Sequence, residues 1–87
     1  MFEVTMTKRA RKGMAKMPAL QVSLLARLVK DLKESGPVQR QWLNYSKLGG
    51  NKHHCHLSYH WVACWEETAT GVRIEVYYAG SRESAPY

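Results

Sequence analysis

Apolar and polar side chains alternate at the start of the chain, where polar residues separate Phe2, Val4 and Met6. Successive side chains of a β-strand point to opposite faces, so this alternation predicts a short, half-buried strand. Thr7 follows and can cap a helix with its side-chain oxygen. The helix expected next, over Lys8–Lys16, is strongly basic.

The clearest pattern is that of an amphipathic helix over about Ala19–Glu34. Its leucines recur every four residues, at Leu20, Leu24, Leu28 and Leu32. Residues three and four apart lie on one side of a helix, so the leucines predict an apolar stripe that packs on a core. Pro18 is expected to end or kink the basic helix, and Ser35-Gly36-Pro37 to end the amphipathic one.

Three β runs are expected in the second half of the chain, and they are Lys52–Ser58, Trp61–Glu67 and Val72–Ala79. Gly49-Gly50-Asn51 and Thr70-Gly71 are turn sequences, while Val38–Leu48 predicts a loop or an irregular short strand. Consecutive strands joined by tight turns favour an antiparallel meander. Residues 1–87 are therefore expected to form a single α+β domain of order β-α-α-β-β-β, with both helices on one face of a small sheet.

The two faces of this meander would carry different side chains. If Tyr59-His60 is a two-residue turn, Cys55 faces Cys64 across the hairpin. The core face then carries small or apolar residues, which are Cys55, Leu57, Val62, Cys64, Val72, Ile74 and Val76. The exposed face is rich in aromatic and imidazole groups, and its residues are His54, His56, Trp61, Trp65, Arg73, Glu75 and Tyr77. A turn one residue longer would change this pairing.

Net charge narrows the choice of partner. Lys and Arg number 13 against 7 Asp and Glu, which favours a polyanion such as nucleic acid, an acidic protein segment or an anionic membrane surface. No apolar stretch is long enough to span a bilayer, and the first residues lack the apolar core of a secretory signal. We therefore expect a cytoplasmic protein without membrane contact, in which Cys55 and Cys64 are reduced thiols.

All four histidines and both cysteines fall between His53 and Trp65, which raises the question of a metal site. His and Cys are the ligands that zinc prefers. Adjacent strand residues point to opposite faces, however, and the segment has neither a CxxC nor an HxxxH pair. We expect no metal and no cofactor. The simpler interpretation is that the cysteines are small core residues and the histidines ordinary surface residues.

Two residues after the last β run could complete a site with these histidines. Arg82 follows that run directly, and Tyr87 lies five residues further on. A short tail can fold back over a sheet and bring a guanidinium, which binds phosphate through a fixed fork of donors, near the imidazoles. The simpler interpretation is a solvated arginine and a frayed terminus.

The order of elements and several short segments resemble the RelE/ParE superfamily of toxin–antitoxin toxins, in particular its RelE/HigB-like branch of cytotoxic translational repressors. The segments that carry this resemblance are Lys47-Leu48-Gly49, His54-Cys55-His56-Leu57, Trp61–Glu66, Ile74–Arg82 and Tyr87. The resemblance implies a small basic ribonuclease that cuts mRNA, typically in the ribosomal A site. It also implies neutralisation by a co-transcribed antitoxin protein.

The same resemblance assigns roles to particular residues. His54 and His56 stand where RelE-type toxins have two strand lysines, while Arg82 and Tyr87 match an arginine after the last strand and a C-terminal tyrosine. The arginine that follows the turn in RelE-type toxins falls near Trp61, so its function is missing or moved. The candidates to replace it are His60, Arg73 and Arg40.

These residues can cleave RNA without a metal, by attack of the 2′-OH on the neighbouring phosphate. A histidine with a pKa near 6.5 can act as base or acid at neutral pH. The expected catalytic residues, with His56 as the base, are His54, His56, Arg82 and Tyr87. The expected RNA-binding residues are Lys47, Lys52, Trp61, Trp65 and Arg73. Two alternatives remain open: a ParE-like gyrase-inhibiting toxin, and a non-catalytic module that binds RNA or protein.

Overall fold

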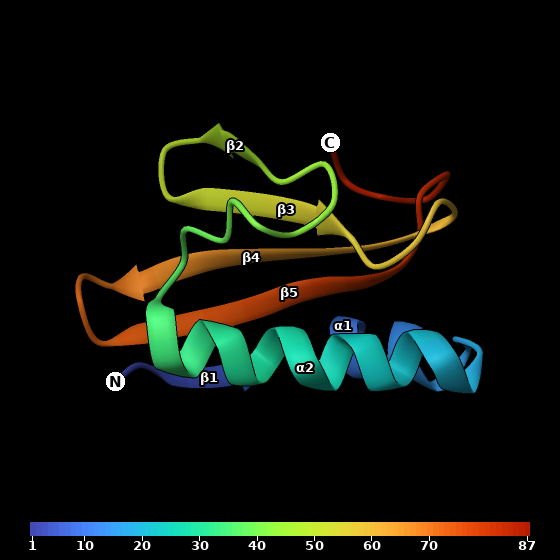
Figure 1. Ribbon diagram of the computed structural model, residues 1–87, viewed down its shortest axis with the longest axis horizontal. Helices are drawn as coiled ribbons and strands as arrows, with labels where there is room; N and C mark the ends of the chain where they lie inside the picture. Colours follow the sequence, from blue (N-terminus) through green and yellow to red (C-terminus); the bar gives the residue numbers. More distant parts are fainter.

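The computed structural model describes residues 1–87 as two helices and five strands (Figure 1). In chain order these are β1 (Glu3–Met6), α1 (Lys8–Ala15), α2 (Ala19–Ser35), β2 (Ser46–Gly49), β3 (Lys52–His56), β4 (Trp61–Ala69) and β5 (Arg73–Ser81). One sheet contains all five strands in the order β1-β5-β4-β3-β2, with β1 parallel to β5 and the other neighbours antiparallel. The predicted α+β class and the β3-β4-β5 meander are confirmed.

The sheet is wider than the predicted three-stranded meander. The first strand joins one edge, where Glu3 pairs with Arg73 in parallel. The segment predicted as a loop or irregular short strand supplies β2 at the other edge, where Ser46 pairs with His54. The positions that flank the meander are therefore filled by short strands from the first half of the chain.

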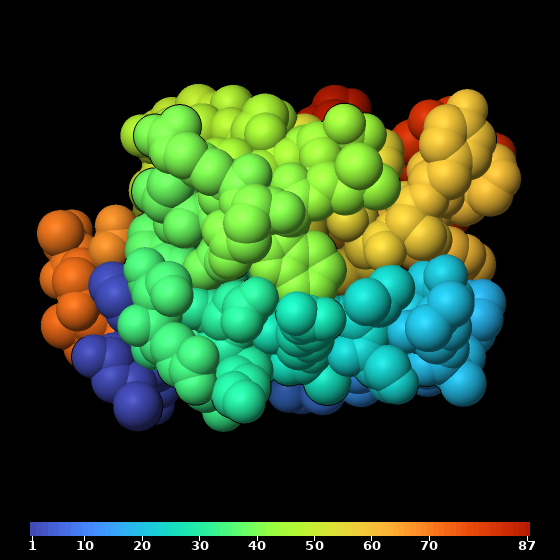
Figure 2. Space-filling model, in the orientation of Figure 1, coloured from blue at the N-terminus to red at the C-terminus, as the bar shows by residue number.

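α2 lies across one face of the sheet, which we call the helix face. Together with the segment that follows it, α2 covers the middle of the side of the molecule seen in Figure 2. Leu25, Leu28 and Leu32 are buried in the main core, whereas Leu20 is 66% exposed. A helix has 3.6 residues per turn, so a strict four-residue repeat drifts around its surface and leaves the first leucine outside the contact.

The hairpin between β3 and β4 differs from the prediction by one residue. Cys55 pairs with Ala63, not with Cys64, and His54 takes Cys64 as its partner. The Leu57 amide donates to the Trp61 carbonyl at 2.8 Å, which closes a three-residue turn instead of the predicted two-residue turn. Because the side-chain period of a strand is two, this shift moves every β4 side chain to the other face.

The shift corrects the predicted positions of both hairpin tryptophans and of Cys64. Trp65 is fully buried on the helix face, and its Nε1 donates to the Pro37 carbonyl at 2.9 Å. Trp61 packs against the same core. Cys64 lies with Val62 and Tyr78 in a second, smaller cluster on the opposite face of the sheet. The two cysteines are thus on different faces, and burial raises the pKa of both thiols to about 12.

The last strand carries a β-bulge and starts one residue later than predicted. Cys64 pairs with Tyr78 but Trp65 pairs with Val76, so Tyr77 has no partner. The bulge lets Val76 and Ala79 both lie in the main core, while Tyr77 and Tyr78 contact the smaller cluster. Val72, predicted for the core, precedes β5 and is 55% exposed. It belongs to the turn, where no neighbouring element covers it.

α1 is fixed against the edge of β5 just beyond the point where β1 ends. The Thr7 hydroxyl accepts a hydrogen bond from the Ala10 amide at 3.1 Å, as the predicted helix cap requires, and donates to the Tyr77 carbonyl at 3.3 Å. Gly13 then lies directly on β5, because a Cβ atom added to it would stand 1.7 Å from the Ala79 carbonyl oxygen. Only glycine permits this approach of helix to strand.

We expect Gly13→Ala to destabilise the protein by about 1–3 kcal/mol, because α1 must move off β5 to admit the methyl group. Helix propensity alone predicts that the same substitution stabilises the protein, since alanine is the better helix former by about 1 kcal/mol. Urea unfolding measures the difference. Ala15→Ser, at an exposed position of the same helix, is the control and should change stability by less than about 0.5 kcal/mol. A Gly13→Ala protein as stable as the parent would show that the contact is not required.

Candidate functional site

Two histidines lie side by side on the face of the sheet that is turned away from α2. We call it the imidazole face, and its residues include His54, His56, Val62, Cys64 and Tyr78. The ring centroids of His54 and His56 are 5.7 Å apart, as expected for alternate residues of one strand. Each side chain is only 8% exposed. The pair lies on the same face as the apolar side chains of Val62 and Cys64, its partners across the hairpin.

The neighbouring edge strand holds one of these rings. Ser46 on β2 is paired with His54, and its Oγ lies 3.0 Å from His54 Nδ1. A hydrogen bond to one ring nitrogen fixes the orientation of an imidazole and leaves the other nitrogen free for a ligand. Ser46 was not among the predicted site residues. The only signal in the sequence is a hydroxyl next to Lys47, in a segment whose pairing the sequence does not define.

The residues after β5 fold back over the imidazole face. The Tyr87 ring contacts the His54 ring, with centroids 4.4 Å apart. The Arg82 amide donates to the His60 carbonyl at 2.7 Å, and its guanidinium lies 4.6 Å from the centre of the Tyr59 ring. The structure therefore brings the four predicted catalytic residues to one face. Tyr59, which the sequence did not single out, positions the guanidinium from the β3–β4 turn.

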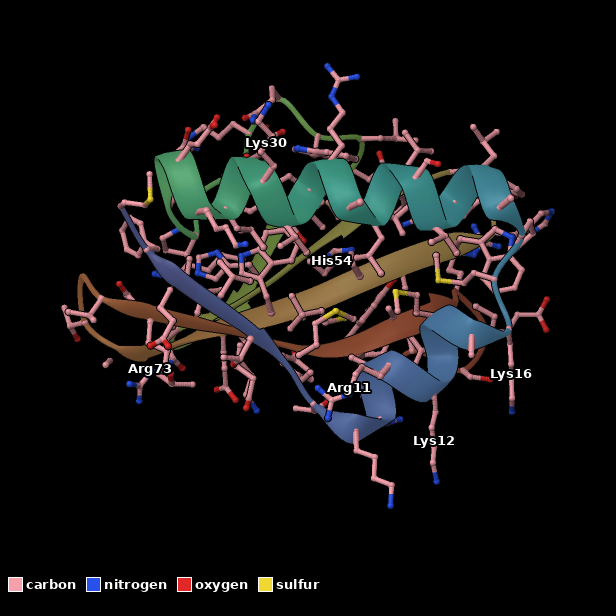
Figure 3. All side chains as sticks on the ribbon, turned by 90° about the horizontal axis from the view of Figure 1, so that it is seen from below. Arg11, Lys12, Lys16, Lys30, His54 and Arg73 are labelled. Atoms are coloured by element: carbon pink, nitrogen blue, oxygen red, sulfur yellow. The ribbon has the colours of Figure 1, made fainter.

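The five predicted RNA-binding residues are dispersed. Lys52, at the start of β3, has its Nζ 5.8 Å from the centre of the Tyr77 ring, and Lys47 is exposed on the adjacent edge strand. Trp65 is enclosed in the core and offers no ring face to a base, and half-buried Trp61 lies on the helix-face side. Arg73, which is labelled in Figure 3, pairs with Glu3 at the start of β5, whereas Arg82 follows the end of that strand.

His53 is a structural residue. Its ring lies parallel to that of Trp65, with centroids 6.0 Å apart and 6° between the planes. Its Nδ1 is 2.7 Å from the Tyr45 hydroxyl, and the side chain is buried on the helix face. His60, by contrast, is exposed on the turn against Tyr59. The cluster of four histidines thus separates into a core residue, a facing pair and a surface residue.

The comparisons with known proteins rest on structure. The sequence matches no protein-family model, and it matches no curated protein. A solved structure described as a YoeB/ParE toxin from Agrobacterium tumefaciens superposes with a TM-score of 0.76 at 13% identity, covering 93% of this chain and 99% of that one. This chain has the RelE/ParE toxin fold.

Two toxin–antitoxin complexes contain chains with the same fold. A chain of the archaeal RelE–RelB complex from Pyrococcus horikoshii OT3 gives a TM-score of 0.74 at 11% identity, covering 97% of this chain and 98% of that one. A chain of the E. coli DinJ–YafQ complex gives 0.75 at 12% identity, with 99% and 98% covered. The fold expected from the sequence resemblance is confirmed, and identities this low carry the fold alone.

Electrostatics keep both imidazoles of this RelE/ParE fold neutral near pH 7. Burial lowers the pKa of His54 below its usual 6.5, and the neighbouring His56 lowers it further, whereas a backbone hydrogen bond with Ser46 raises it. Burial and the charge of Arg82 lower the pKa of His56. Burial raises the pKa of Tyr87 above its usual 10.0, although Arg82 opposes this shift. The site therefore combines two proton acceptors, a protonated phenol and a guanidinium.

Two further structural findings concern metal ions and membranes. No group of three or more His, Cys, Asp or Glu side chains is arranged to hold a metal ion. Neither helix has the length and apolar character needed to cross a bilayer.

Lowering the pH should reduce the unfolding free energy of this protein, because His53 must become protonated. Burial and the charge of Lys47 lower the pKa of His53 below 6.5 in the folded protein, so the unfolded chain binds a proton more readily. Its contribution to stability is complete above pH 6.5 and is lost as the pH falls through the folded pKa. We expect His53→Gln to flatten the fall of unfolding free energy between neutral pH and about pH 5. Urea titrations measure this, and His60→Gln is the control. An unchanged pH slope in His53→Gln would contradict the prediction.

The charge of Arg82 should be visible in the titration of His56. We expect Arg82→Ala to raise the pKa of His56, because the guanidinium disfavours a second positive charge beside it. Proton NMR of the imidazole rings measures the pKa of each histidine. The reciprocal control is Lys47→Ala, which should raise the pKa of His53 and leave His56 unchanged. If Arg82→Ala leaves His56 unmoved, the guanidinium is not part of the site.

Proposed function

We propose that this chain is the toxin of a type II toxin–antitoxin system. In this proposal it is an endoribonuclease that cuts mRNA on the ribosome in the cytoplasm and so inhibits translation. The observation that carries the proposal is the gathering of two neutral imidazoles, Arg82 and Tyr87 on one face of a RelE/ParE fold. The net charge of +6 supports a polyanionic substrate.

The reaction that suits these groups is transesterification of RNA. His56 accepts the proton of the 2′-OH while the 2′-oxygen forms a bond to phosphorus. The Arg82 guanidinium stabilises the charge that develops on the phosphorane. The bond to the 5′-oxygen then breaks, and that oxygen takes a proton from the Tyr87–His54 pair. The products are a 2′,3′-cyclic phosphate and a 5′-OH, so the reaction needs no water and no oxidant.

The geometry supports this division of roles. His56 is the imidazole whose pKa Arg82 lowers, so the proposed base is the histidine that responds to the charge that would bind the phosphate. Tyr87 keeps its proton at neutral pH and touches His54, which is held by Ser46. The His54 ring lies between its two partners in this scheme, 5.7 Å from the His56 ring and 4.4 Å from the Tyr87 ring by their centroids, so groups for both sides of one phosphodiester are held in fixed positions.

The antitoxin is part of the proposal. The structures with this fold include the RelE–RelB and DinJ–YafQ complexes, in which each toxin is bound to a partner protein. By the same arrangement, this chain would be held inactive by a co-transcribed protein. An acidic partner suits it best, because its own charge is strongly positive.

Cleavage of mRNA on programmed ribosomes tests the catalytic residues. We expect His56→Ala to slow cleavage about 10²–10⁴-fold, the usual contribution of a general base. Arg82→Ala should slow cleavage about 10²–10³-fold through lost charge stabilisation. Tyr87→Phe should lose rate on normal mRNA but not on RNA with sulfur in place of the scissile 5′-oxygen, since that leaving group needs no proton. His60→Ala, on the same hairpin but outside the site, is the control.

Three results would contradict this function. Cleavage at the parental rate by all the site variants would mean that the catalytic residues are wrong. Growth arrest on expression without any loss of mRNA, and with DNA-damage signalling, would favour a ParE-like gyrase inhibitor. Binding without growth arrest, unaffected by Arg82→Ala, would favour a non-catalytic module.

A further inference from the structure

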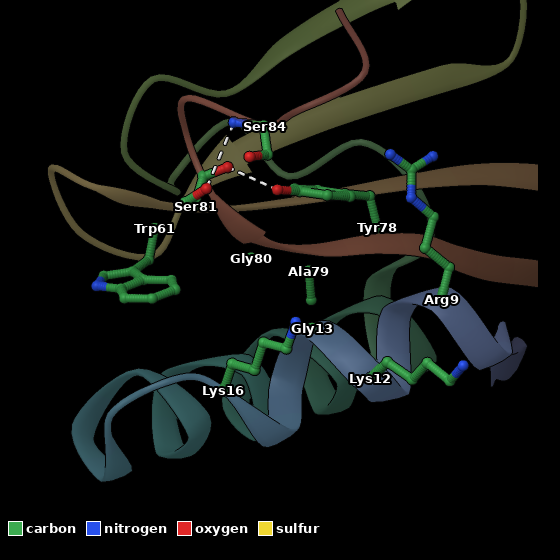
Figure 4. Close-up of a pocket in the computed structure, with 10 residues that line it drawn as sticks. All are labelled: Arg9, Lys12, Gly13, Lys16, Trp61, Tyr78, Ala79, Gly80, Ser81 and Ser84. Atoms are coloured by element: carbon green, nitrogen blue, oxygen red, sulfur yellow. Dashed lines mark hydrogen bonds between the residues drawn. The ribbon is translucent and has the colours of Figure 1, made fainter.

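A groove of about 390 Å³ lies between α1 and the C-terminal end of β5 (Figure 4). One side of it is helix α1, which contributes Arg9, Lys12 and Lys16. These residues are spaced by three and four, so they share one side of the helix. The other side is formed by Ser81, Ser84 and Trp61. Its floor is the close contact between Gly13 and Ala79.

The groove has an uncompensated positive charge. None of its ten lining residues is acidic. The molecule has one ion pair, between Arg73 and Glu3, so the three cations of the groove have no carboxylate partner. Arg9 is held in place, because its guanidinium lies 5.1 Å from the centre of the Tyr78 ring. A negatively charged ligand would supply the missing counter-charge.

The remaining lining groups favour a nucleic-acid strand over an acidic peptide. Ser81 and Ser84 supply two hydroxyls beside the cations, and the Ser84 amide donates to Ser81 Oγ at 3.3 Å. Trp61 ends the groove with a half-buried ring, which offers a surface on which a base can stack. Proteins that bind single-stranded nucleic acids usually combine cationic side chains along the phosphate backbone with an aromatic ring on which a base stacks.

The groove is continuous with the imidazole face through the tail. Ser81 and Ser84 line the groove, while Arg82 between them and Tyr87 beyond belong to the candidate catalytic site. Tyr78 lies between the groove and the imidazole face. The Arg9 guanidinium of the groove lies over its ring, and Tyr78 belongs to the cluster with Val62 and Cys64 on the face that carries the histidines. A strand that is bound at the histidines can therefore continue around the tail into the groove.

We infer that this groove binds the phosphate backbone of single-stranded RNA, as a continuation of the strand that is cut at the imidazole face. The inference rests on the proposed ribonuclease function and adds a second contact to it. Lys12 and Lys16 bind phosphates, Ser81 and Ser84 donate hydroxyl hydrogen bonds, and Trp61 stacks on a base.

The test compares two double variants that lose equal charge. Lys12→Ala/Lys16→Ala removes two groove cations, whereas Lys30→Ala/Lys33→Ala removes two exposed cations from α2, on another side of the molecule (Figure 3). The probes are uncleavable 2′-O-methyl oligouridylates of about four and about twelve nucleotides, which span the range of single-strand site sizes. Fluorescence anisotropy gives each affinity as a function of salt.

The groove variant should bind the long probe more weakly while binding the short probe as the parent does. Its plot of log affinity against log salt should lose about 1.4 units of slope, because two phosphate contacts are removed at about 0.7 each. The α2 variant should keep the parental slope. Lys12→Arg/Lys16→Arg should restore binding of the long probe, which excludes misfolding as the cause of the loss.

Two results would overturn the inference. Equal losses in the two alanine variants would mean that only net charge matters. If the groove variant binds the long probe normally but fails to bind polyglutamate, the groove is a docking surface for an acidic protein. The outcome for catalysis is separate, because cleavage is measured on programmed ribosomes and binding is measured on probes that cannot be cut. If His56→Ala abolishes cleavage but the groove variant binds the long probe like the parent, only the inference about the groove is wrong. If the groove variant loses the long probe but the parent protein cuts no RNA, only the proposed ribonuclease function is wrong.

Discussion

The pairing of β3 with β4 decides which side chains this sheet buries and which it presents to a ligand. A hydrogen bond between Leu57 and Trp61 closes a turn of three residues and so sets the register. The register places Trp65 in the core and Cys64 beneath the histidines. The imidazoles lie over an apolar floor of Val62 and Cys64 as a result, and burial lowers the pKa of both histidines. A shift of one residue would replace this floor with an indole on the outside of the protein.

Two consecutive residues where β2 begins each form a hydrogen bond with one histidine of β3. Tyr45, just before the strand, bonds His53 on the helix face, and Ser46 bonds His54 on the imidazole face. Two neighbouring histidines with the same intrinsic chemistry thus acquire different functions. The first is part of a buried aromatic stack, and the second is oriented at the edge of an open site.

The helices, the meander and the fold class could be predicted because their signals are local: leucine spacing, the Thr7 cap, and alternation between turns. The hairpin register could not, since Ser58-Tyr59-His60 contains no glycine or asparagine to fix the length of the turn. The four catalytic candidates came from the family resemblance and from strand alternation. Ser46 was missed because its contact with His54 depends on a β2–β3 pairing that the sequence does not define. Tyr59 and the groove were missed because they depend on contacts between residues far apart in sequence.

The parallel pairing of β1 with β5 joins residues about 70 positions apart, as the contact of Glu3 with Arg73 shows. A chain that is still being synthesised has no β5 for β1 to pair with, and α1 has no strand edge on which to dock. The sheet therefore closes only after β5 has left the ribosome, and Arg82 and Tyr87, which follow that strand, come into position later still. The face that carries His54 and His56 is thus completed last, after the other strands of the sheet have been synthesised.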